Sequence, residues 1–358
     1  MAITDASAMP RSRATRARTL HLWLMLLLVG VGVFSLTVGA TGTSLWAALQ
    51  KLAVGTPLDV AERAVLLNIR LPRLVLGCVV GAGLAVSGAV LQGLFRNPLA
   101  DPGLIGVTAG ATLGAIIAIV LGGTVLAVFT GPVSAILEPV LVPFAAFLGA
   151  WIITLTLYRV ATRRGQTSVA TMLLAGIALS ALTMALSGVL IFMADDQQLR
   201  DLTFWGLGSL AGASWSKIAI AAPIILAAVI GACVLGPALN GLALGEATAR
   251  HIGIPVQRMK RFAILTCAAA TGTAVAVSGG IGFIGIVVPH LLRLATGPDH
   301  RPLLINSALL GAVLLVLSDM LARIIVAPAE LPIGIITAVL GAPVFLWILL
   351  RQRGIVDL

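Results

Sequence analysis

Apolar stretches recur along the whole chain and are separated by short segments that hold charged residues, proline and glycine. Each stretch is about 20 residues long, which is the length that an α-helix needs to cross the hydrocarbon core of a bilayer. No alternation of apolar and polar residues marks a strand, and no separate soluble domain is visible in the sequence. We therefore predict an all-α polytopic membrane protein with about ten transmembrane helices, near residues 20–40, 71–95, 103–125, 138–160, 168–193, 215–236, 260–280, 282–297, 303–326 and 332–351.

The composition strengthens this prediction, because 59% of the 358 residues are hydrophobic and only 10% are charged. The mean hydropathy of +1.10 lies far outside the range of soluble globular domains. The 39 glycines suit close helix packing in lipid, where small residues let two backbones approach each other. Gly279 and Gly280 separate the seventh and eighth spans so tightly that one of these two spans must be short or tilted.

The chain begins with a basic segment, residues 1–19, which we predict to be a cytoplasmic tail. The apolar run from Leu20 to Ala40 ends in small residues that resemble a signal-peptidase site. However, the run is longer than the roughly 7 to 15 residues usual for a signal peptide. We expect an uncleaved first span, one membrane domain over residues 20–351 and a cytoplasmic tail over residues 352–358.

The Lys and Arg residues gather at alternate ends of the predicted spans. With the N-terminus inside the cell, 16 of the 23 fall at inner ends and seven at outer ends, as expected for cytoplasmic loops. An even number of spans then returns the C-terminus to the cytoplasm. The basic residues do not form one stripe with interleaved aromatic residues, so the net charge of +10 gives no reason to expect a nucleic-acid partner.

The outer connections hold most of the acidic residues, and two of them, residues 41–70 and 194–214, are among the longest in the chain. The segment from Ser44 to Lys51 has the pattern of an amphipathic helix. We expect this helix to lie on the outer surface of the membrane.

At the outer end of the second span the sequence reads LNIRLPR, residues 67–73. Pro72 suits the first turn of a helix, where its missing N–H would be unpaired anyway, so Arg70 and Arg73 are predicted to flank the helix mouth. Arg323, at the outer end of the ninth span, joins them, with Asp319 one turn earlier as its expected partner. These arginines are either interfacial anchors or a fork that binds carboxylates on an external partner.

The longest inner connection, residues 235–258, contains the polar sequence GEATARHIGI. The segment from Glu246 to Gly253, with Ala247 and Arg250 inside it, is predicted to form two helical turns that end at a glycine. It is either an ordinary surface helix or a rigid lever presented to a cytoplasmic partner. The chain has no G-x-x-x-x-G-K-[ST] motif with which to hydrolyse ATP, so we expect a transport subunit and not an enzyme.

Other polar residues mark the inner ends of the third to fifth spans. The loop LFRNPLADPGL is predicted to turn at the membrane face, where it is anchored by Arg96 and Asn97 and bent at Pro98. In the fifth span, small and weakly polar residues form one helix face that serves either tight packing or a translocation path, namely Gly176, Ser180, Thr183 and Ser187. At its inner end, a cytoplasmic gate is expected at Gln166, Thr167 and Ser168.

The residue types that usually bind metals do not form a site in this sequence. The four histidines, His21, His251, His290 and His300, share no metal-ligand spacing, and we predict no metal and no bound cofactor. The three cysteines lie inside apolar runs and are interpreted as small buried hydrophobic residues, namely Cys78, Cys233 and Cys267.

Five motifs taken together resemble the permease subunit of the ATP-binding-cassette importers for iron-siderophore, heme and cobalamin. They are LNIRLPR (67–73), SGAVLQGLFRNPLADPGLIGVTAGA (87–111), LALGEATARHIGI (242–254), SGGIGFIGIVVPHLLRLATGPDHR (278–301) and AELPIGIITAVLGAPVFLWILLR (329–351). One departure is Gly280, where many members of the family have proline, and we expect it to loosen the turn between spans seven and eight.

This resemblance implies a bacterial inner-membrane homodimer with two cytoplasmic ATPase subunits, which bind the ATP and Mg²⁺, and a periplasmic or external substrate-binding protein. It also implies that the helix from Glu246 to Gly253 is the coupling helix that sits in a cleft of the ATPase. Arg70, Arg73 and Arg323 match arginines that meet acidic residues of the binding protein in this family.

The substrate is expected to be heme, because FRNPLADPGLIG, TFWGLGSLAG (203–212) and IVAPAELPIG (325–334) look closest to heme permeases. Cobalamin permeases share much of this pattern, so cobalamin or a ferric siderophore is the alternative within the family. An ion-coupled secondary transporter is the alternative of another class. Such a transporter needs several intramembrane acids, and Asp319 is the only candidate in the sequence.

Overall fold

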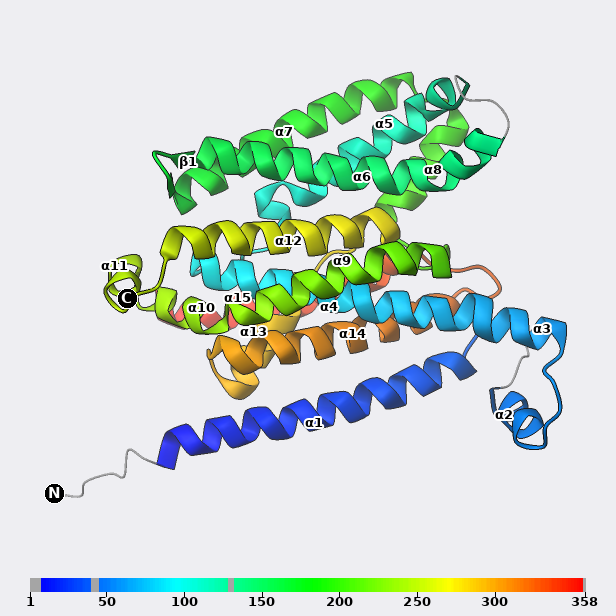
Figure 1. The fold of residues 1–358 in the computed structure, drawn as a ribbon, viewed down its shortest axis with the longest axis horizontal. Helices are drawn as coiled ribbons and strands as arrows, with labels where there is room; N and C mark the ends of the chain where they lie inside the picture. The colour runs from blue at the N-terminus through cyan, green and yellow to red at the C-terminus, as the bar shows by residue number, and fades with distance from the viewer. Residues whose placement is uncertain (1–7, 40–44, 128–131, 357–358) are drawn as a thin grey trace.

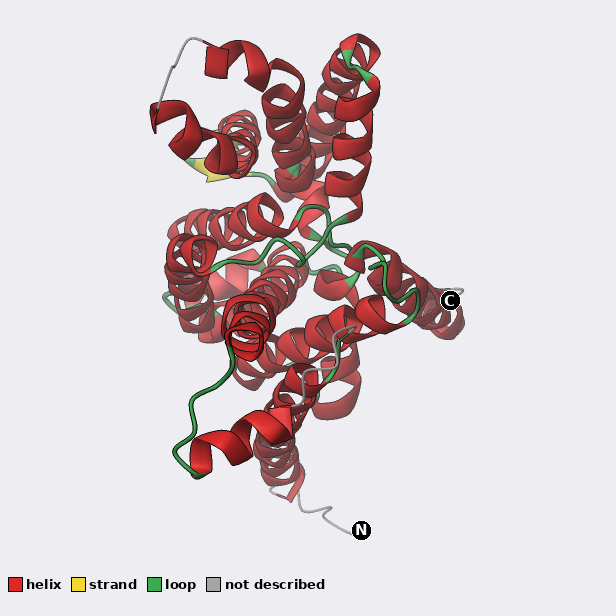
Figure 2. Ribbon diagram, turned by 90° about the vertical axis from the view of Figure 1, so that its right-hand side faces the viewer, coloured by secondary structure: helices red, strands yellow, loops and turns green. Residues whose placement is uncertain are grey.

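The computed structural model describes residues 8–39, 45–127 and 132–356, and most of them are helical (Figure 1 and Figure 2). In this part of the chain eight helices are long and apolar enough to cross a membrane, and two shorter apolar helices cover Ile284–Thr296 and Ile333–Ile348. Each of these ten helices overlaps one predicted span. The all-α polytopic fold predicted from the sequence is confirmed.

The elements are named here in chain order. They are α1 (Ala8–Thr37), α2 (Leu45–Ala53), α3 (Val60–Arg63), the π-helix η1 (Ala64–Arg70), α4 (Leu71–Phe95), the 3₁₀-helix η2 (Pro102–Ile105), α5 (Val107–Ala127), α6 (Pro132–Ala161), β1 (Thr162–Arg163), β2 (Gln166–Thr167), α7 (Val169–Met193), α8 (Asp196–Leu207), α9 (Trp215–Val234), α10 (Gly236–Ala243), α11 (Glu246–His251), α12 (Val256–Ser278), α13 (Ile284–Thr296), α14 (His300–Ile324) and α15 (Ile333–Val356).

Helix α4 forms the centre of the bundle, and most of its 25 residues are buried. It packs against α9, α12, α13 and α14, whereas α5, α6 and α7 form a separate group on the far side of α12 (Figure 1). Helix α1 lies at the opposite edge and packs chiefly on α14. A helix that is apolar all round has no face for water, so α4 occupies the position that its sequence demands.

Glycines allow the central helices to touch backbone to backbone. A Cβ atom on Gly88 of α4 would overlap the carbonyl oxygen of Gly285 in α13, and one on Gly81 would overlap that of Gly311 in α14. Lipid tails are as apolar as leucine side chains, so membrane helices associate through such close van der Waals contacts. The glycine content noted in the sequence therefore serves packing at these crossings.

The two ends of the bundle hold different sets of elements, as the sequence-based topology requires. The start of α1, helix α11 and the β1–β2 hairpin lie at one end in Figure 1, together with the end of α15. Helices α2 and α3 lie at the other end. The even number of crossings inferred from the sequence agrees with this arrangement.

The start of the second span differs from the prediction. The helical rod begins at Val60 and not at residue 71, so Pro72 lies inside it and not in its first turn. Immediately before Pro72 the chain forms the π-helix η1, in which the N–H of Leu71 donates to the carbonyl of Leu66, five residues back. The next bond of this pattern would need the missing N–H of Pro72, and the indole Nε1 of Trp215 instead donates to the carbonyl of Leu67 at 2.9 Å.

The predicted tails and loops are also more regular than the sequence indicated. Helix α1 begins at Ala8, inside the predicted tail 1–19, and α15 continues to Val356, inside the predicted tail 352–358. Residues 1–7 and 357–358 of these tails lie outside the described residues. The tail residues next to a span are helical because extending an existing helix costs less free energy than nucleating a new one.

Two of the loops hold further regular elements. The outer connection 194–214 contains α8, which starts with a capping box between Asp195 and Gln198, a signal that apolar-run analysis does not use. The amphipathic helix is confirmed as α2, although Ser44 lies outside the described residues. Helix α13 is the short member of the pair separated by Gly279 and Gly280.

Replacing Gly88 with alanine should destabilise the protein by about 1–3 kcal/mol, because the added methyl group forces α4 away from α13. Gly30→Ala in α1 is the matched control, since no atom lies within 4 Å of a Cβ placed there. Thermal unfolding of both purified variants in detergent measures the difference. Equal melting temperatures would show that the α4–α13 contact tolerates separation.

Candidate functional sites at the two ends of the bundle

A cluster of buried charges joins α4 and α14 at the outer end. Arg73 Nε lies 2.8 Å from Asp319 Oδ1, and Arg323 Nε lies 3.1 Å from Asp319 Oδ2. A second carboxylate, that of Glu330, lies 2.9 Å from Arg73 Nη1 and is 40% exposed. One buried aspartate therefore pairs with two arginines, and Glu330 provides the second negative charge at the outer side of the cluster.

Two of the arginines also fasten the end of α1. Arg323 donates from Nη2 to Ser35 Oγ at 2.9 Å and from Nη1 to the carbonyl of Val38 at 3.0 Å. Arg70 Nη1 donates to the carbonyl of Leu36 at 2.6 Å. The last carbonyls of a helix have no partner within that helix, so guanidinium groups are well suited to this end of α1.

The position of these arginines corrects one expectation. The pair between Arg323 and Asp319 is confirmed. However, Arg70, Arg73 and Arg323 are each no more than 5% exposed and do not form an open fork at the outer surface. A charge this deep needs a partner within the protein. Asp319 is that partner for Arg73 and Arg323, and Arg70 donates to the carbonyl of Leu36. Their role in docking a binding protein stays a prediction.

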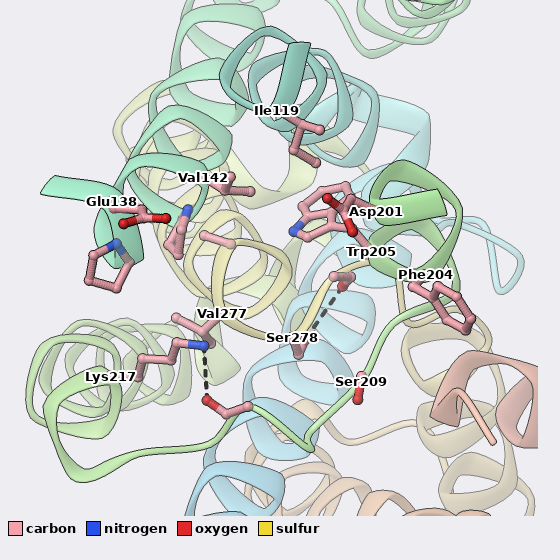
Figure 3. Close-up of a pocket in the computed structure, with 15 residues that line it drawn as sticks. Ile119, Glu138, Val142, Asp201, Phe204, Trp205, Ser209, Lys217, Val277 and Ser278 are labelled. Carbon is pink, nitrogen blue, oxygen red and sulfur yellow. Dashed lines mark hydrogen bonds between the residues drawn. The ribbon is translucent and has the colours of Figure 1, made fainter. Parts of the chain in front are cut away.

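A cavity of about 450 Å³ lies near the outer end between α6, α8, α9 and α12 (Figure 3). Glu138 and Asp201 lie on opposite sides of it, and Trp205 and Val277 contribute apolar walls. The ammonium group of Lys217 donates to the carbonyl of Gly212 at 2.9 Å. The cavity therefore has acidic, basic and aromatic walls, and sequence analysis missed it because α8 was not predicted.

Gly280 is expected from the sequence to loosen the turn beside this cavity. The structure shows instead that this turn is tightly packed. Gly279 has a φ of +71° and lies so close to α8 that a Cβ there would overlap the carbonyl oxygen of Trp205. A Cβ on Gly280 would lie 2.6 Å from the carbonyl oxygen of Gly206. A proline ring does not fit against this backbone, so glycine is the residue that lets α8 approach.

At the inner end, α11 has the predicted glycine stop. The helix ends at His251, and Gly253 follows with a φ of +85°. The N–H of Gly253 donates to the carbonyl of Arg250 at 3.0 Å, and that of Ile254 to the carbonyl of Ala249 at 2.9 Å. These two bonds are those of a Schellman motif, and they give the short helix a rigid end.

The four predicted coupling residues do not all face the same way. Ala247, Arg250 and Gly253 are exposed. Glu246 turns inward, where Oε1 lies 2.5 Å from Nζ of Lys260 in α12, and its other oxygen lies 3.6 Å from Arg250. The exposed face of α11 is therefore available to a partner, whereas Glu246 holds the helix on the bundle.

The predicted gate residues lie at the same end of the bundle as α11 and contact α12 (Figure 1). Gln166 and Thr167 form β2, and Ser168 caps α7 by accepting a hydrogen bond from the N–H of Thr171 at 3.3 Å. Two side chains of α12 bind Thr167: Gln257 accepts from its N–H at 2.8 Å, and Lys260 donates to its carbonyl at 2.8 Å. Sequence analysis missed Lys260 because it counted this residue only as a cytoplasmic charge, although its place at the start of the seventh span was a signal.

The small-residue face of α7 packs inside the chain. Gly176, Thr183 and Ser187 are buried, Ser180 is half-buried, and a Cβ on Gly176 would overlap the carbonyl oxygen of Leu104 in η2. The opposite face of α7 exposes large apolar side chains, namely Leu174, Ile177, Met184 and Phe192. The packing alternative explains the small residues within one chain, and their role in a translocation path stays a prediction.

The inner loop after α4 is stabilised by its own polar residues. Arg96 ends α4 with a φ of +50°, and its side chain is exposed. Asn97 Oδ1 accepts from the N–H of Leu99 at 2.9 Å, which forms the turn around Pro98. Asp101 Oδ1 accepts from the N–H of Gly103 at 2.8 Å and caps η2, while burial raises the pKa of this carboxyl group. The side chain of Asn97 therefore anchors the loop, whereas Arg96 contributes only the left-handed backbone conformation that ends α4.

Comparison with known proteins identifies this arrangement. The family model described as the FecCD transport family matches residues 26–351. The chain belongs to this family. The resemblance inferred from the five motifs is therefore confirmed, and the chain is a membrane transport permease.

Three relatives illustrate the match. The hemin transport system permease protein HmuU of Yersinia pestis is 45% identical over 337 residues, covering 92% of this chain and 95% of that protein. The cobalamin import system permease protein BtuC of Halobacterium salinarum is 43% identical over 317 residues, covering 87% and 80%. A solved inward-facing metal-chelate type ABC transporter superposes with a TM-score of 0.80 at 32% identity, covering 93% of this chain and 99% of that chain.

Replacing Asp319 with alanine should destabilise the protein by about 3–5 kcal/mol, because it leaves Arg73 and Arg323 without their shared buried carboxylate. Glu330→Ala should cost far less, since this side chain is 40% exposed and water replaces it. Thermal unfolding of the two variants in detergent compares them directly. Similar losses in both would contradict a cluster centred on Asp319.

Proposed function

We propose that this FecCD permease is the transmembrane subunit of an ATP-driven importer that moves heme from an external binding protein into the cytoplasm. The observation that carries this proposal is the 45% identity with a hemin permease, which extends over 92% of the chain. The heme-type motifs lie in the loop after α4, in α8 and its following turn, and in the connection before α15.

Cobalamin is the second candidate substrate. A cobalamin permease is 43% identical over 87% of the chain, and the structural neighbour is a metal-chelate type transporter. Heme, cobalamin and ferric siderophores are all large metal chelates, so one scaffold suits each of them. Selectivity among these substrates must therefore come from the side chains that line the translocation path between the two copies of the chain.

The proposed assembly contains two copies of this chain, two cytoplasmic ATPase subunits and an external binding protein. The rigid helix α11, with Ala247 and Arg250 exposed, supports docking of an ATPase that holds the ATP and Mg²⁺. The exposed apolar face of α7 supports pairing with a second copy. A carboxylate of the binding protein would reach Arg73 by displacing Glu330, the exposed member of the outer cluster.

The proposed location is the bacterial inner membrane, with both termini in the cytoplasm. The excess of Lys and Arg at one side of the spans supports this orientation. In the structure that side holds α11, the hairpin and the start of α1. In this orientation α11 faces the cytoplasm, where the ATPase subunits would bind it.

The secondary-transporter alternative is weakened by the position of Asp319. A proton or ion relay needs a carboxylate that changes its partner during transport. Asp319 is held between Arg73 and Arg323, both of which also fasten other elements. Releasing it would break the outer end of the bundle.

In proteoliposomes that contain this chain with its ATPase subunits and binding protein, hemin uptake should require ATP hydrolysis. A non-hydrolysable ATP analogue should abolish uptake, and excess cobalamin should not compete. Uptake by this chain alone, driven by an ion gradient, would contradict an ATP-driven importer. Uptake of labelled cobalamin in place of hemin would assign the second candidate substrate.

Arg250→Glu should weaken association with the ATPase subunits, because it reverses a charge on the exposed face of α11. Arg258→Glu, an exposed residue just outside α11, is the matched control. Co-purification of the ATPase at several salt concentrations measures the effect. Glu246 is left intact, since it pairs with buried Lys260. Unchanged binding in Arg250→Glu would exclude this face as the docking surface.

A further inference from the structure

Two consecutive helices, α11 and α12, and the β1–β2 hairpin, which lies far from them in sequence, meet at one buried lysine at the inner end of the bundle. Lys260 is 2% exposed and belongs to the first turns of α12. Its ammonium group lies 2.5 Å from the carboxylate of Glu246 in α11 and 2.8 Å from the carbonyl of Thr167 in β2. The same cation therefore binds both the helix exposed to the cytoplasm and the hairpin between α6 and α7.

The hairpin is stiff enough to transmit a displacement. Arg164 and Gly165, the two residues between its strands, have φ values of +51° and +75°, which is the left-handed pair that a type I′ turn requires. The N–H of Ser168, just after β2, donates to the carbonyl of Ala161 at 3.0 Å, and α7 begins at the next residue. A movement of Thr167 is thus a movement of the inner end of α7.

The contact through Lys260 is the one that reaches α11. Gln257, one turn earlier in α12, accepts from the N–H of Thr167 at 2.8 Å and ties the hairpin to α12 alone. Lys260 ties the hairpin to Glu246 as well, and Glu246 is the first residue of α11. A hydrogen bond from a buried charge is stronger than one between neutral groups, so this link resists separation.

We propose that Lys260 is a positioning residue that makes α11 and the β1–β2 hairpin move together, so that displacement of α11 by an ATPase opens or closes the inner end of α7. The proposal rests on the proposed function of α11 as the ATPase-docking helix. It assigns to Lys260 the transmission step between nucleotide hydrolysis and the gate.

A charge swap separates the two contacts of Lys260. In the double variant Glu246→Lys with Lys260→Glu, the ion pair between α11 and α12 is kept, but a carboxylate at position 260 cannot donate to the carbonyl of Thr167. Gln257→Ala is the matched control, because it removes a hairpin contact that does not involve α11. Both variants are compared with the wild-type chain in the full complex with its ATPase subunits and binding protein.

The readout is the number of substrate molecules transported per ATP hydrolysed. We expect this ratio to fall about tenfold in the swap, the factor that corresponds to 1.4 kcal/mol. The ratio is measured only on complexes that retain their ATPase subunits, because the lysine at position 246 lies beside Arg250 of the docking helix. Gln257→Ala should keep most of the coupling. Equal losses in both variants would mean that the hairpin only needs to be held on α12, and an unchanged ratio in the swap would also overturn the proposal.

A distance measurement on a chain that keeps Glu246 and Lys260 tests the proposal even if the swap does not fold. Spin labels at Gln166→Cys in β2 and His251→Cys in α11, both exposed, are introduced after replacement of the three native cysteines. We expect their separation to stay constant between nucleotide-free and ATP-bound complexes. A change in this distance on ATP binding would overturn the linkage, whereas a wild-type complex without ATP-driven uptake would instead contradict the proposed function.

Discussion

Close backbone contact between helices is the constraint on which the rest of this structure depends. Water does not drive helices together in lipid, so α4 is held at the centre by contacts that only glycine allows, at Gly81 against Gly311 and at Gly88 against Gly285. These contacts fix the distances from α4 to α13 and α14. The outer charge cluster, which spans α4 and α14, forms only at that separation.

Charge appears at depth only where the packing provides a partner. At the outer end Asp319 pairs with both Arg73 and Arg323. Arg73 also pairs with Glu330, whereas Arg323 donates to the carbonyl of Val38 just after α1. At the inner end Lys260 has a carboxylate and a carbonyl as partners. Both sites join elements that are distant in sequence, α4 with α14 at the outer end and α12 with the hairpin at the inner end. Removal of one partner would leave a buried charge. The buried charge pairs at Asp319 and Lys260 therefore stabilise the two ends of the bundle. They also link the elements proposed to bind the partner proteins.

In the irregular backbone of the second span, too, a polar group receives its partner from a neighbouring helix. Pro72 removes a donor from the rod, and the chain responds with the π-helix η1 and with an indole donor from Trp215 to the carbonyl of Leu67. Arg70 and Arg73 then leave the rod on the sides that face α1 and α14. Packing of α1 and α14 against this rod therefore places both arginines in a buried cluster and not at an open surface.

The sequence by itself determined the helical class, the ten spans, the glycine stop after α11 and the family, because span length, hydropathy, caps and motifs are local properties of the chain. It also indicated the pair between Arg323 and Asp319, which lie one helical turn apart. Only the tertiary structure decided that Arg73 shares the same aspartate, that Glu246 turns inward, and that Lys260 joins α11 to the hairpin. These contacts connect residues far apart in the chain, and their geometry depends on how closely the helices pack, which no local pattern specifies.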